Sequence, residues 1–199
     1  MGFCRRYPGG AEIELTMLFA DLRGSTAMAE RMAPAEFADA MKRFYAAATE
    51  VLIRTDAYID KLVADEVVGL YFPLFAGKWH ARKAVGAAQE LLRVSGYGTD
   101  QGPLLPIGIG VHYGRAYVGT VTGAEGTVAD LAALGHDVNL TARLSSKADA
   151  GEVLLSEAAC AASALDLEHL ERRQVELKGH TGPFGVRVMR PTTPRFLTV

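Results

Sequence analysis

Residues 15–20, Leu15-Thr16-Met17-Leu18-Phe19-Ala20, form a short and nearly continuous apolar run. A run of this kind favours a central strand buried on both faces over a surface strand, in which apolar and polar residues alternate. The run stops at Asp21, and a polar stretch follows at 23–26. The sequence therefore predicts a buried strand with an acidic residue at its end.

The next segments alternate between helical and strand patterns. Pro34 is well placed as a first helical residue, and apolar residues then recur at helical spacing as far as Leu52. Two strands are expected at 58–63 and 67–72, and the acidic pair between them predicts a hairpin with Asp65 at its turn.

A second helical pattern follows this hairpin, and more strands come after it. The expected elements are a helix at about 80–93, a loop at 96–106, strands at 106–112 and 116–121 around a turn at 113–115, a helix from about 138, a strand at 153–155, a small Ala-rich helix, and strands at 174–178 and 185–189. Strand, helix, hairpin, helix, strand is the ferredoxin-like βαββαβ order. We predict an α+β fold with this core, extended by C-terminal strands and a helix.

Composition indicates one globular domain. The chain has 199 residues, 49% of them hydrophobic, and we place the domain at 12–190 between tails at 1–11 and 191–199. The 21 Lys and Arg against 23 Asp and Glu give a net charge of -2, so no nucleic acid partner is indicated. No apolar run approaches the roughly 20 residues of a membrane span, and the two cysteines are too few for a disulfide framework. We expect a cytoplasmic protein with no membrane segment.

Two acidic residues interrupt apolar surroundings where the chain turns, Asp21 after the first strand and Asp65 in the hairpin. If the two elements are neighbours in the sheet, their carboxylates converge. Paired carboxylates suit Mg²⁺ or Mn²⁺, which bridge protein carboxylates to substrate phosphates. The alternative is that both are ordinary turn aspartates, since Asp is common in turns.

Further charged or amide side chains are candidates for binding a ligand. Lys61 lies within an apolar strand, so it is either at a sheet edge or directed at a ligand. Asn139 and Arg143 are four residues apart on a predicted helix and share one face, which is either solvated or part of a site. Arg115, in the expected turn, and Lys178, at the expected end of a strand, are candidates for phosphate binding.

Five motifs occur in order within residues 12–189. They are Leu18-Phe19-Ala20-Asp21-Leu22-Arg23-Gly24-Ser25-Thr26, then Lys61-Leu62-Val63-Ala64-Asp65-Glu66, then Val111-His112-Tyr113-Gly114-Arg115, then Leu134-Gly135-His136-Asp137-Val138-Asn139-Leu140-Thr141-Ala142-Arg143-Leu144, and finally Leu177-Lys178-Gly179. These motifs resemble, in family order, those of class III adenylyl and guanylyl cyclases, in which the first is the opening metal motif. Together they are far more specific than any one of them.

The resemblance implies a metal-dependent nucleotidyl cyclase. Asp21 and Asp65 would hold two Mg²⁺ or Mn²⁺ ions, with the carbonyl of Leu22 as a further ligand. Arg143 would stabilise charge that builds on the α-phosphate in the transition state, and Asn139 would position the ribose.

The same resemblance implies how substrate is bound. Arg115 and Lys178 would neutralise the triphosphate, Lys61 would donate a hydrogen bond to the purine, and Ala132 occupies the position of the second purine-reading residue. Lys61 is the adenine-type residue, so ATP is the expected substrate, with GTP as the alternative. Because family members share each site between opposite subunits, a chain holding both residue sets is expected to form a head-to-tail homodimer.

Three positions depart from the family pattern. Ala132 stands where adenylyl cyclases usually have Asp or Thr, Ala64 stands where glycine precedes the second metal aspartate, and His136 replaces a common Asp. These departures leave open a degenerate cyclase-homology domain that dimerises and binds nucleotide without turnover. A diguanylate cyclase is a further alternative, disfavoured by the missing Gly-Gly before Asp65 and by the spacing of Asn139 and Arg143.

Overall fold

The computed structural model describes residues 9–122 and 129–192, and the predicted tails lie largely outside these ranges. The described elements are β1 (Ala11–Leu22), α2 (Ser25–Arg31), α3 (Pro34–Arg54), β2 (Tyr58–Val63), β3 (Glu66–Tyr71), α4 (Pro73–Ala76), α5 (His80–Val94), β4 (Ile107–Thr122), β5 (Ala129–Leu134), α6 (His136–Lys147), β6 (Val153–Ser156), α7 (Glu157–Ser163), β7 (Glu171–Val175) and β8 (Phe184–Met189). No helix among them is long and apolar enough to cross a membrane.

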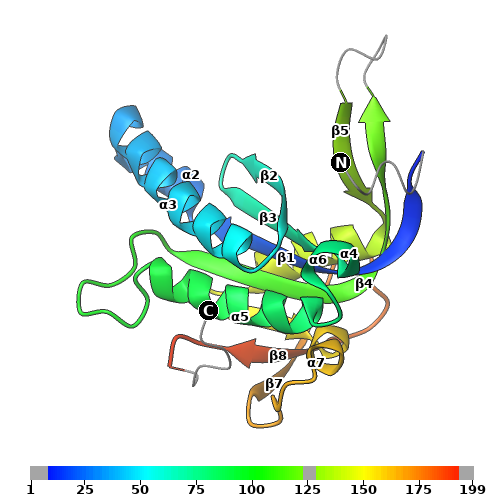
Figure 1. Ribbon diagram of the computed structural model, residues 1–199. Helices are drawn as coiled ribbons and strands as arrows, with labels where there is room; N and C mark the ends of the chain where they lie inside the picture. The colour runs from blue at the N-terminus through cyan, green and yellow to red at the C-terminus, as the bar shows by residue number, and fades with distance from the viewer. Residues whose placement is uncertain (1–8, 123–128, 193–199) are drawn as a thin grey trace.

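The described strands form one mixed sheet in the order β2-β3-β1-β4-β6-β8-β7, with β5 paired to β4 (Figure 1). The four strands β2-β3-β1-β4 have the ferredoxin-like order, and the helices between them fall where the βαββαβ plan requires. The predicted α+β fold is confirmed.

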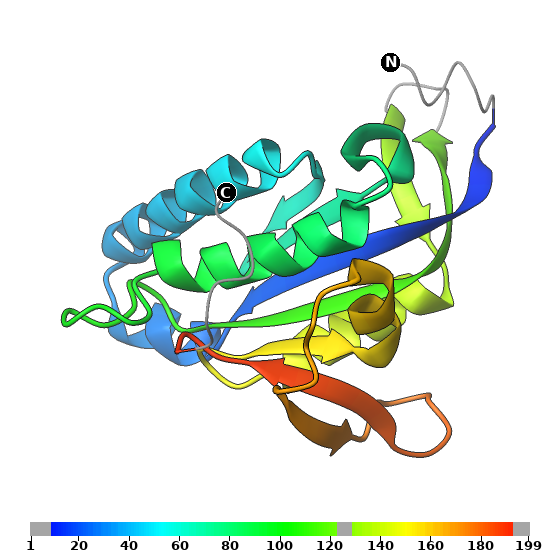
Figure 2. The same cartoon turned by 60° about the horizontal axis from the view of Figure 1, so that its bottom comes forward.

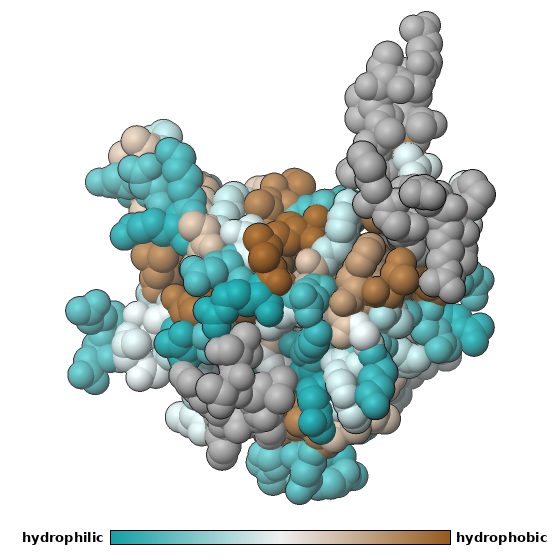
Figure 3. Space-filling view, viewed as in Figure 1, coloured by the Kyte–Doolittle hydropathy of each residue, from teal (hydrophilic) through white to brown (hydrophobic). Residues whose placement is uncertain are grey.

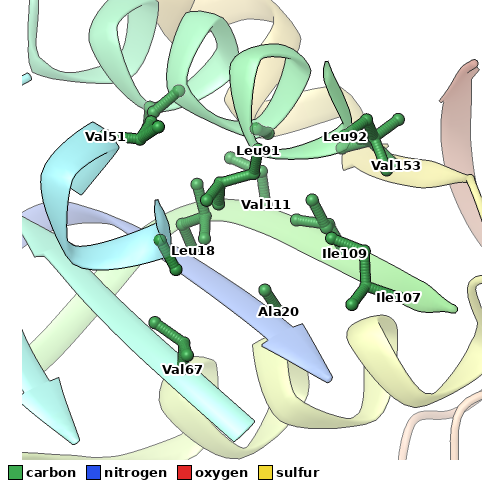
Figure 4. Close-up of a cluster of buried hydrophobic side chains, with 14 of the residues drawn as sticks. Leu18, Ala20, Val51, Val67, Leu91, Leu92, Ile107, Ile109, Val111 and Val153 are labelled. Carbon is green, nitrogen blue, oxygen red and sulfur yellow. The ribbon is translucent and has the colours of Figure 1, made fainter. Parts of the chain in front are cut away.

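Strand β1 lies between β3 and β4 and is buried on both faces, as its continuous apolar run predicts. Leu18 and Ala20 face the core under α3 and α5, whereas Met17 and Phe19 face the opposite core cluster, against which α6 packs. Figure 4 shows the first of these clusters, with side chains from the sheet meeting those of both helices.

Helix α6 covers the face of the sheet opposite α3 and α5 (Figure 2). It lies very close to β4 because the strand offers glycine where the two cross. A Cβ atom at Gly110 would lie 2.5 Å from the backbone nitrogen of Ser145. Small residues in β4 therefore determine how closely α6 packs on the sheet, and with it where Asn139 and Arg143 lie.

The predicted turn at 113–115 is wrong, because β4 is a single strand that runs through these residues. Its first part pairs with β1 and its last part pairs with β5, so the strand stays in a ladder along its length. Gly114 serves packing rather than a turn, since a Cβ there would collide with the carboxylate of Asp137.

Other differences concern short elements. The polar stretch after Asp21 begins helix α2, and strand β5, which carries Ala132, has too little apolar alternation to be recognised. Lys178 is not at the end of a strand, since β7 ends at Val175. It lies instead in the segment that joins β7 to β8.

Candidate active site

The end of β1 and the turn of the β2–β3 hairpin bring carboxylates together. Asp21 pairs across the ladder with Glu66, and the backbone N–H of Leu22 donates to the carbonyl of Asp65 at 3.0 Å. The predicted convergence of Asp21 and Asp65 is therefore confirmed, and Glu66 lies beside them on the same face of the sheet as Asp21.

Burial and mutual repulsion disfavour negative charge in this cluster. Burial raises the pKa of Asp21, the nearby charge of Asp65 raises it further, and Arg23 acts in the opposite direction. The pKa of Glu66 is also raised, first by burial and then by Asp21 and Asp65. A cation beside Asp21 and Glu66 would stabilise their ionised forms, and a divalent ion would do this most strongly.

Two neighbouring side chains hold the aspartates in place. The hydroxyl of Ser25 donates to the carboxylate of Asp65 at 2.5 Å. The guanidinium of Arg23 pairs with Asp21 and also donates to the carbonyl of Ser146 at 3.0 Å. Ser146 lies on α6, three residues after Arg143. Arg23 thus connects the carboxylates to the helix that carries Arg143.

The turn residue Ala64 has the left-handed backbone conformation that glycine would adopt without cost. Its φ is 53°, which costs an alanine about 1 kcal/mol or more relative to glycine. The phenol of Tyr45, on α3, donates to the Ala64 carbonyl at 2.7 Å. The glycine that the resemblance implies at this position therefore has a physical reason, and this chain has alanine in that left-handed conformation.

The donor atoms fit Mg²⁺ or Mn²⁺. Hard divalent cations prefer oxygen ligands, and Mg²⁺ is commonly held by one or two carboxylates together with substrate phosphates. Asp21 and Asp65 supply the carboxylates. Leu22, which follows Asp21, is held beside Asp65 by the hydrogen bond from its backbone N–H to the Asp65 carbonyl. Within 9–122 and 129–192, no group of three His, Cys, Asp or Glu side chains forms a metal site by itself.

A second group of predicted residues comes together on α6 and on the segment after β7. The guanidinium of Arg143 donates to the carbonyl of Lys178, and Gly179 leaves room for this contact. Asn139 lies one turn before Arg143 and is exposed to solvent. Arg143 and Lys178 therefore lie together, and Asn139 lies on the same face of α6 as Arg143.

The N-terminal end of α6 is tied to β4 by Asp137. Its carboxylate accepts the backbone N–H of Arg115 at 2.7 Å and lies 3.9 Å from Nε2 of His112. The other ring nitrogen of His112 is 2.9 Å from the hydroxyl of Ser156. Burial lowers the pKa of His112, so the ring favours the neutral form at this junction.

The two groups occupy different places on one chain. Asp21 pairs with Gly108, and Gly108 lies against Ala148, just after the end of α6. Asn139 comes nine residues before Ala148, which corresponds to about 13 Å along the helix axis. The groups also border different cavities. One of about 510 Å³ is lined in part by Ser25 and Asp65, and one of about 430 Å³ is lined in part by Lys178.

Arg115 joins neither the aspartates nor Lys178. It pairs with Glu14 across the β1–β4 ladder, seven positions from the Asp21–Gly108 pair, which corresponds to about 23 Å of strand. Its exposed guanidinium makes ion pairs with Glu12 and Glu14. Its predicted role in triphosphate binding remains a prediction.

Lys61 and Ala132, the predicted purine residues, lie on β2 and β5, two strands that approach each other without pairing. Lys61 is exposed, and its amine is 3.8 Å from the carboxylate of Asp60. Ala132 pairs with Gly119 in the ladder of β4 and β5, which gives it a fixed register.

Sequence reasoning missed three side chains that shape the carboxylate end. Arg23 and Ser25 lie inside the first motif, so the motif itself was the signal that pointed to them. Tyr45 gave no signal, because its place in the apolar pattern of α3 indicated only packing.

The fold and the site define a class of protein: an α+β domain with paired carboxylates at a strand end and, on α6, an arginine that contacts the segment carrying Lys178. The chain belongs to the family of adenylate and guanylate cyclase catalytic domains, whose model matches residues 11–189.

Relatives include both kinds of cyclase. The chain is 27% identical to the solved guanylyl cyclase Cya2, with a TM-score of 0.79 over 90% of this chain and 93% of that one. The adenylyl cyclase CyaB of P. aeruginosa, 24% identical, has the same fold with a TM-score of 0.78 over 95% of this chain and 99% of that one.

Among curated proteins, an adenylate cyclase of Anabaena cylindrica is 29% identical over 136 residues, which are 65% of this chain and 26% of that protein. An uncharacterized protein of Mycobacterium tuberculosis is 27% identical over 194 residues, 94% of this chain and 35% of that protein. The chain thus spans about a third or less of the length of these curated relatives.

Proposed function

We propose that the chain converts ATP into 3′,5′-cyclic AMP and pyrophosphate at sites shared between two copies of the chain. The observation that carries the proposal is the separation of the site into two groups. Asp21 and Asp65 meet at one end of the sheet, whereas Arg143 meets Lys178 where α6 contacts the segment after β7. A head-to-tail pair would place each group opposite the complementary group of the second copy.

The carboxylate group supplies the metal half of each site. Asp21 and Asp65, with the carbonyl of Leu22, would hold two Mg²⁺ or Mn²⁺ ions. When bound, such ions favour ionisation of the ribose 3′-hydroxyl and neutralise the triphosphate. Ser25 keeps the Asp65 carboxylate oriented, and Arg23 neutralises Asp21 until a metal ion replaces it.

The second copy would supply the groups that act on the phosphates and ribose. The 3′-oxygen loses its proton and bonds to the α-phosphorus as the bond to pyrophosphate breaks. Arg143 would stabilise the charge that builds on the α-phosphate, and Asn139 would hold the ribose so that the oxygen is in line. Lys178 would neutralise the triphosphate, and Arg115 is proposed for the same role.

Lys61 would read the purine by a hydrogen bond, and this residue favours adenine. Ala132 offers no hydrogen bond, so the second polar contact to the base is missing. A modest preference for ATP over GTP follows, because an apolar wall discriminates weakly between polar edges. The presence of guanylyl cyclases among the relatives keeps GTP as the second candidate substrate.

Exposed apolar side chains support assembly into a homodimer. Leu62 and Val63 on β2 are 41% and 58% exposed. Tyr117 and Leu134 lie on β4 and β5, whose ribbon projects from the body of the domain in Figures 1 and 2. Figure 3 shows apolar surface over the β2–β3 hairpin and toward α4. Exposed apolar surface of this kind favours a partner, and a second copy is the partner that would complete the site.

The test is turnover by the purified chain. ATP and GTP are each supplied with Mg²⁺ and with Mn²⁺, and cyclic product and pyrophosphate are measured. The proposal expects cyclic AMP with either metal and none after chelation. Nucleotide binding and dimerisation without product would instead favour a domain that has lost catalysis.

A further inference from the structure

The turn that carries Asp65 is restrained by a side chain from a different element. Tyr45 lies on α3, and its phenol donates to the carbonyl of Ala64, the residue directly before Asp65. We propose that Tyr45 is a positioning residue that holds Ala64 in its left-handed conformation and thereby places the Asp65 carboxylate for metal binding. This inference rests on the proposed function.

The restraint acts on the residue that bears the strain. Glycine adopts a φ of 53° freely, whereas alanine prefers other backbone regions, so an alanine turn needs an external contact to remain populated. The Leu22 amide and the Ser25 hydroxyl contact Asp65 itself. Tyr45 contacts Ala64, and so it fixes the peptide that leads into Asp65.

Tyr45 is well anchored for this role. Phe44 and Ala48 on the same helix are buried in the core, and the ring of Tyr45 packs against the same cluster at its edge. The ring centroids of Tyr45 and Phe44 are 6.1 Å apart. The hydroxyl therefore projects from a fixed ring toward the hairpin, and its hydrogen bond requires little ordering of the side chain.

The variant Tyr45→Phe removes the hydroxyl and keeps the ring. We expect it to weaken binding of Mn²⁺, measured by the electron paramagnetic resonance signal of the free ion, by about threefold to tenfold, the effect of one hydrogen bond. The metal concentration for half-maximal turnover should rise by a similar factor. Tyr71→Phe is the matched control, because the phenol of Tyr71 also makes a hydrogen bond, with the hydroxyl of Thr55 at 2.8 Å, at the end of β3 away from the turn.

Ala64→Gly tests the cause. Glycine removes the strain, so Tyr45→Phe should have a clearly smaller effect on Mn²⁺ binding in the glycine background than in the alanine background. An equal loss in both backgrounds would overturn the proposal, as would unchanged Mn²⁺ binding in Tyr45→Phe.

Hydrogen exchange of the amides at residues 64–66 separates this inference from the proposed function. Faster exchange at the turn in Tyr45→Phe than in Tyr71→Phe is expected even in a chain that makes no cyclic nucleotide or binds Mn²⁺ too weakly to measure. If Tyr45→Phe leaves the exchange rates at the turn unchanged, the proposed restraint is refuted. If the wild-type chain shows slow exchange at the turn but no turnover, only the cyclase proposal is refuted.

Discussion

The carboxylate end and the Arg143 end of the candidate site are built in different ways. Asp21 is half-buried at the end of the longest ladder with β4, and contacts from Arg23 and the hairpin turn hold it. Asn139 and Lys178 are exposed, on a helix surface and on a segment outside the strands. Backbone ladders can preform the first end within one chain, whereas the second end presents side chains outward and needs another surface to complete it.

The largest expected effect would break the preformed end. Asp21→Ala and Asp65→Ala should each lower turnover by roughly three orders of magnitude, because the proposed metal pair could not assemble and several kcal/mol of charge stabilisation would be lost. Burial and Asp65 already disfavour ionised Asp21, so the free energy of unfolding of Asp21→Ala should not fall. Thermal unfolding checks this, with the exposed Asp39→Ala as control. Near-normal turnover in either active-site variant would contradict the assignment.

The next prediction tests whether Arg143 acts in a site of a second copy of the chain. Arg143→Ala alone should lower turnover by about a hundredfold to a thousandfold, as expected for loss of a charged transition-state contact. Mixing it with Asp21→Ala should restore about a quarter of wild-type activity, since half of the randomly exchanged dimers would then contain one intact site. If heterodimers form and the mixture stays inactive, the two residues do not share an intersubunit site.

A smaller effect is expected at Ala132, the position proposed to contact the purine. Ala132→Thr adds a hydroxyl worth roughly 0.5 to 1.5 kcal/mol if it bonds the base, so the preference for ATP over GTP should rise severalfold to tenfold. Values of kcat/KM for both triphosphates in both proteins provide the measurement. A wild-type enzyme already strict for ATP, and unaffected by the substitution, would place base selection elsewhere.

The smallest effect concerns His112, which lies beside Asp137 at the start of α6. The pKa of His112 is lowered by burial, so below its unfolded value of about 6.5 the unfolded chain takes up a proton more readily than the folded chain. Its contribution to the free energy of unfolding is therefore present above that pH and is lost as pH falls toward the folded pKa. His112→Asn should show a smaller loss of stability between pH 7 and 5 than wild type, measured by urea unfolding. His169→Asn, at an exposed position, is the control, and equal pH profiles for wild type and His112→Asn would contradict the prediction.

The sequence alone determined the order of the core elements and the place of the two aspartates. Residues 15–20 could be recognised as a buried strand because an unbroken apolar run has one stable environment, between two covered faces. Asp65 could be placed at a turn because an acidic pair separated two apolar strands.

Only the tertiary structure decided what the glycine at 114 does, where Lys178 lies and which side chain supports Ala64. A glycine in a strand pattern is compatible with a turn or with close approach of another element, and the carboxylate of Asp137 selects the second. Tyr45 and Ala64 are 19 residues apart and belong to different elements, so no local pattern connects them. Local sequence fixes backbone preference and burial, whereas contacts between distant segments depend on how the faces pack.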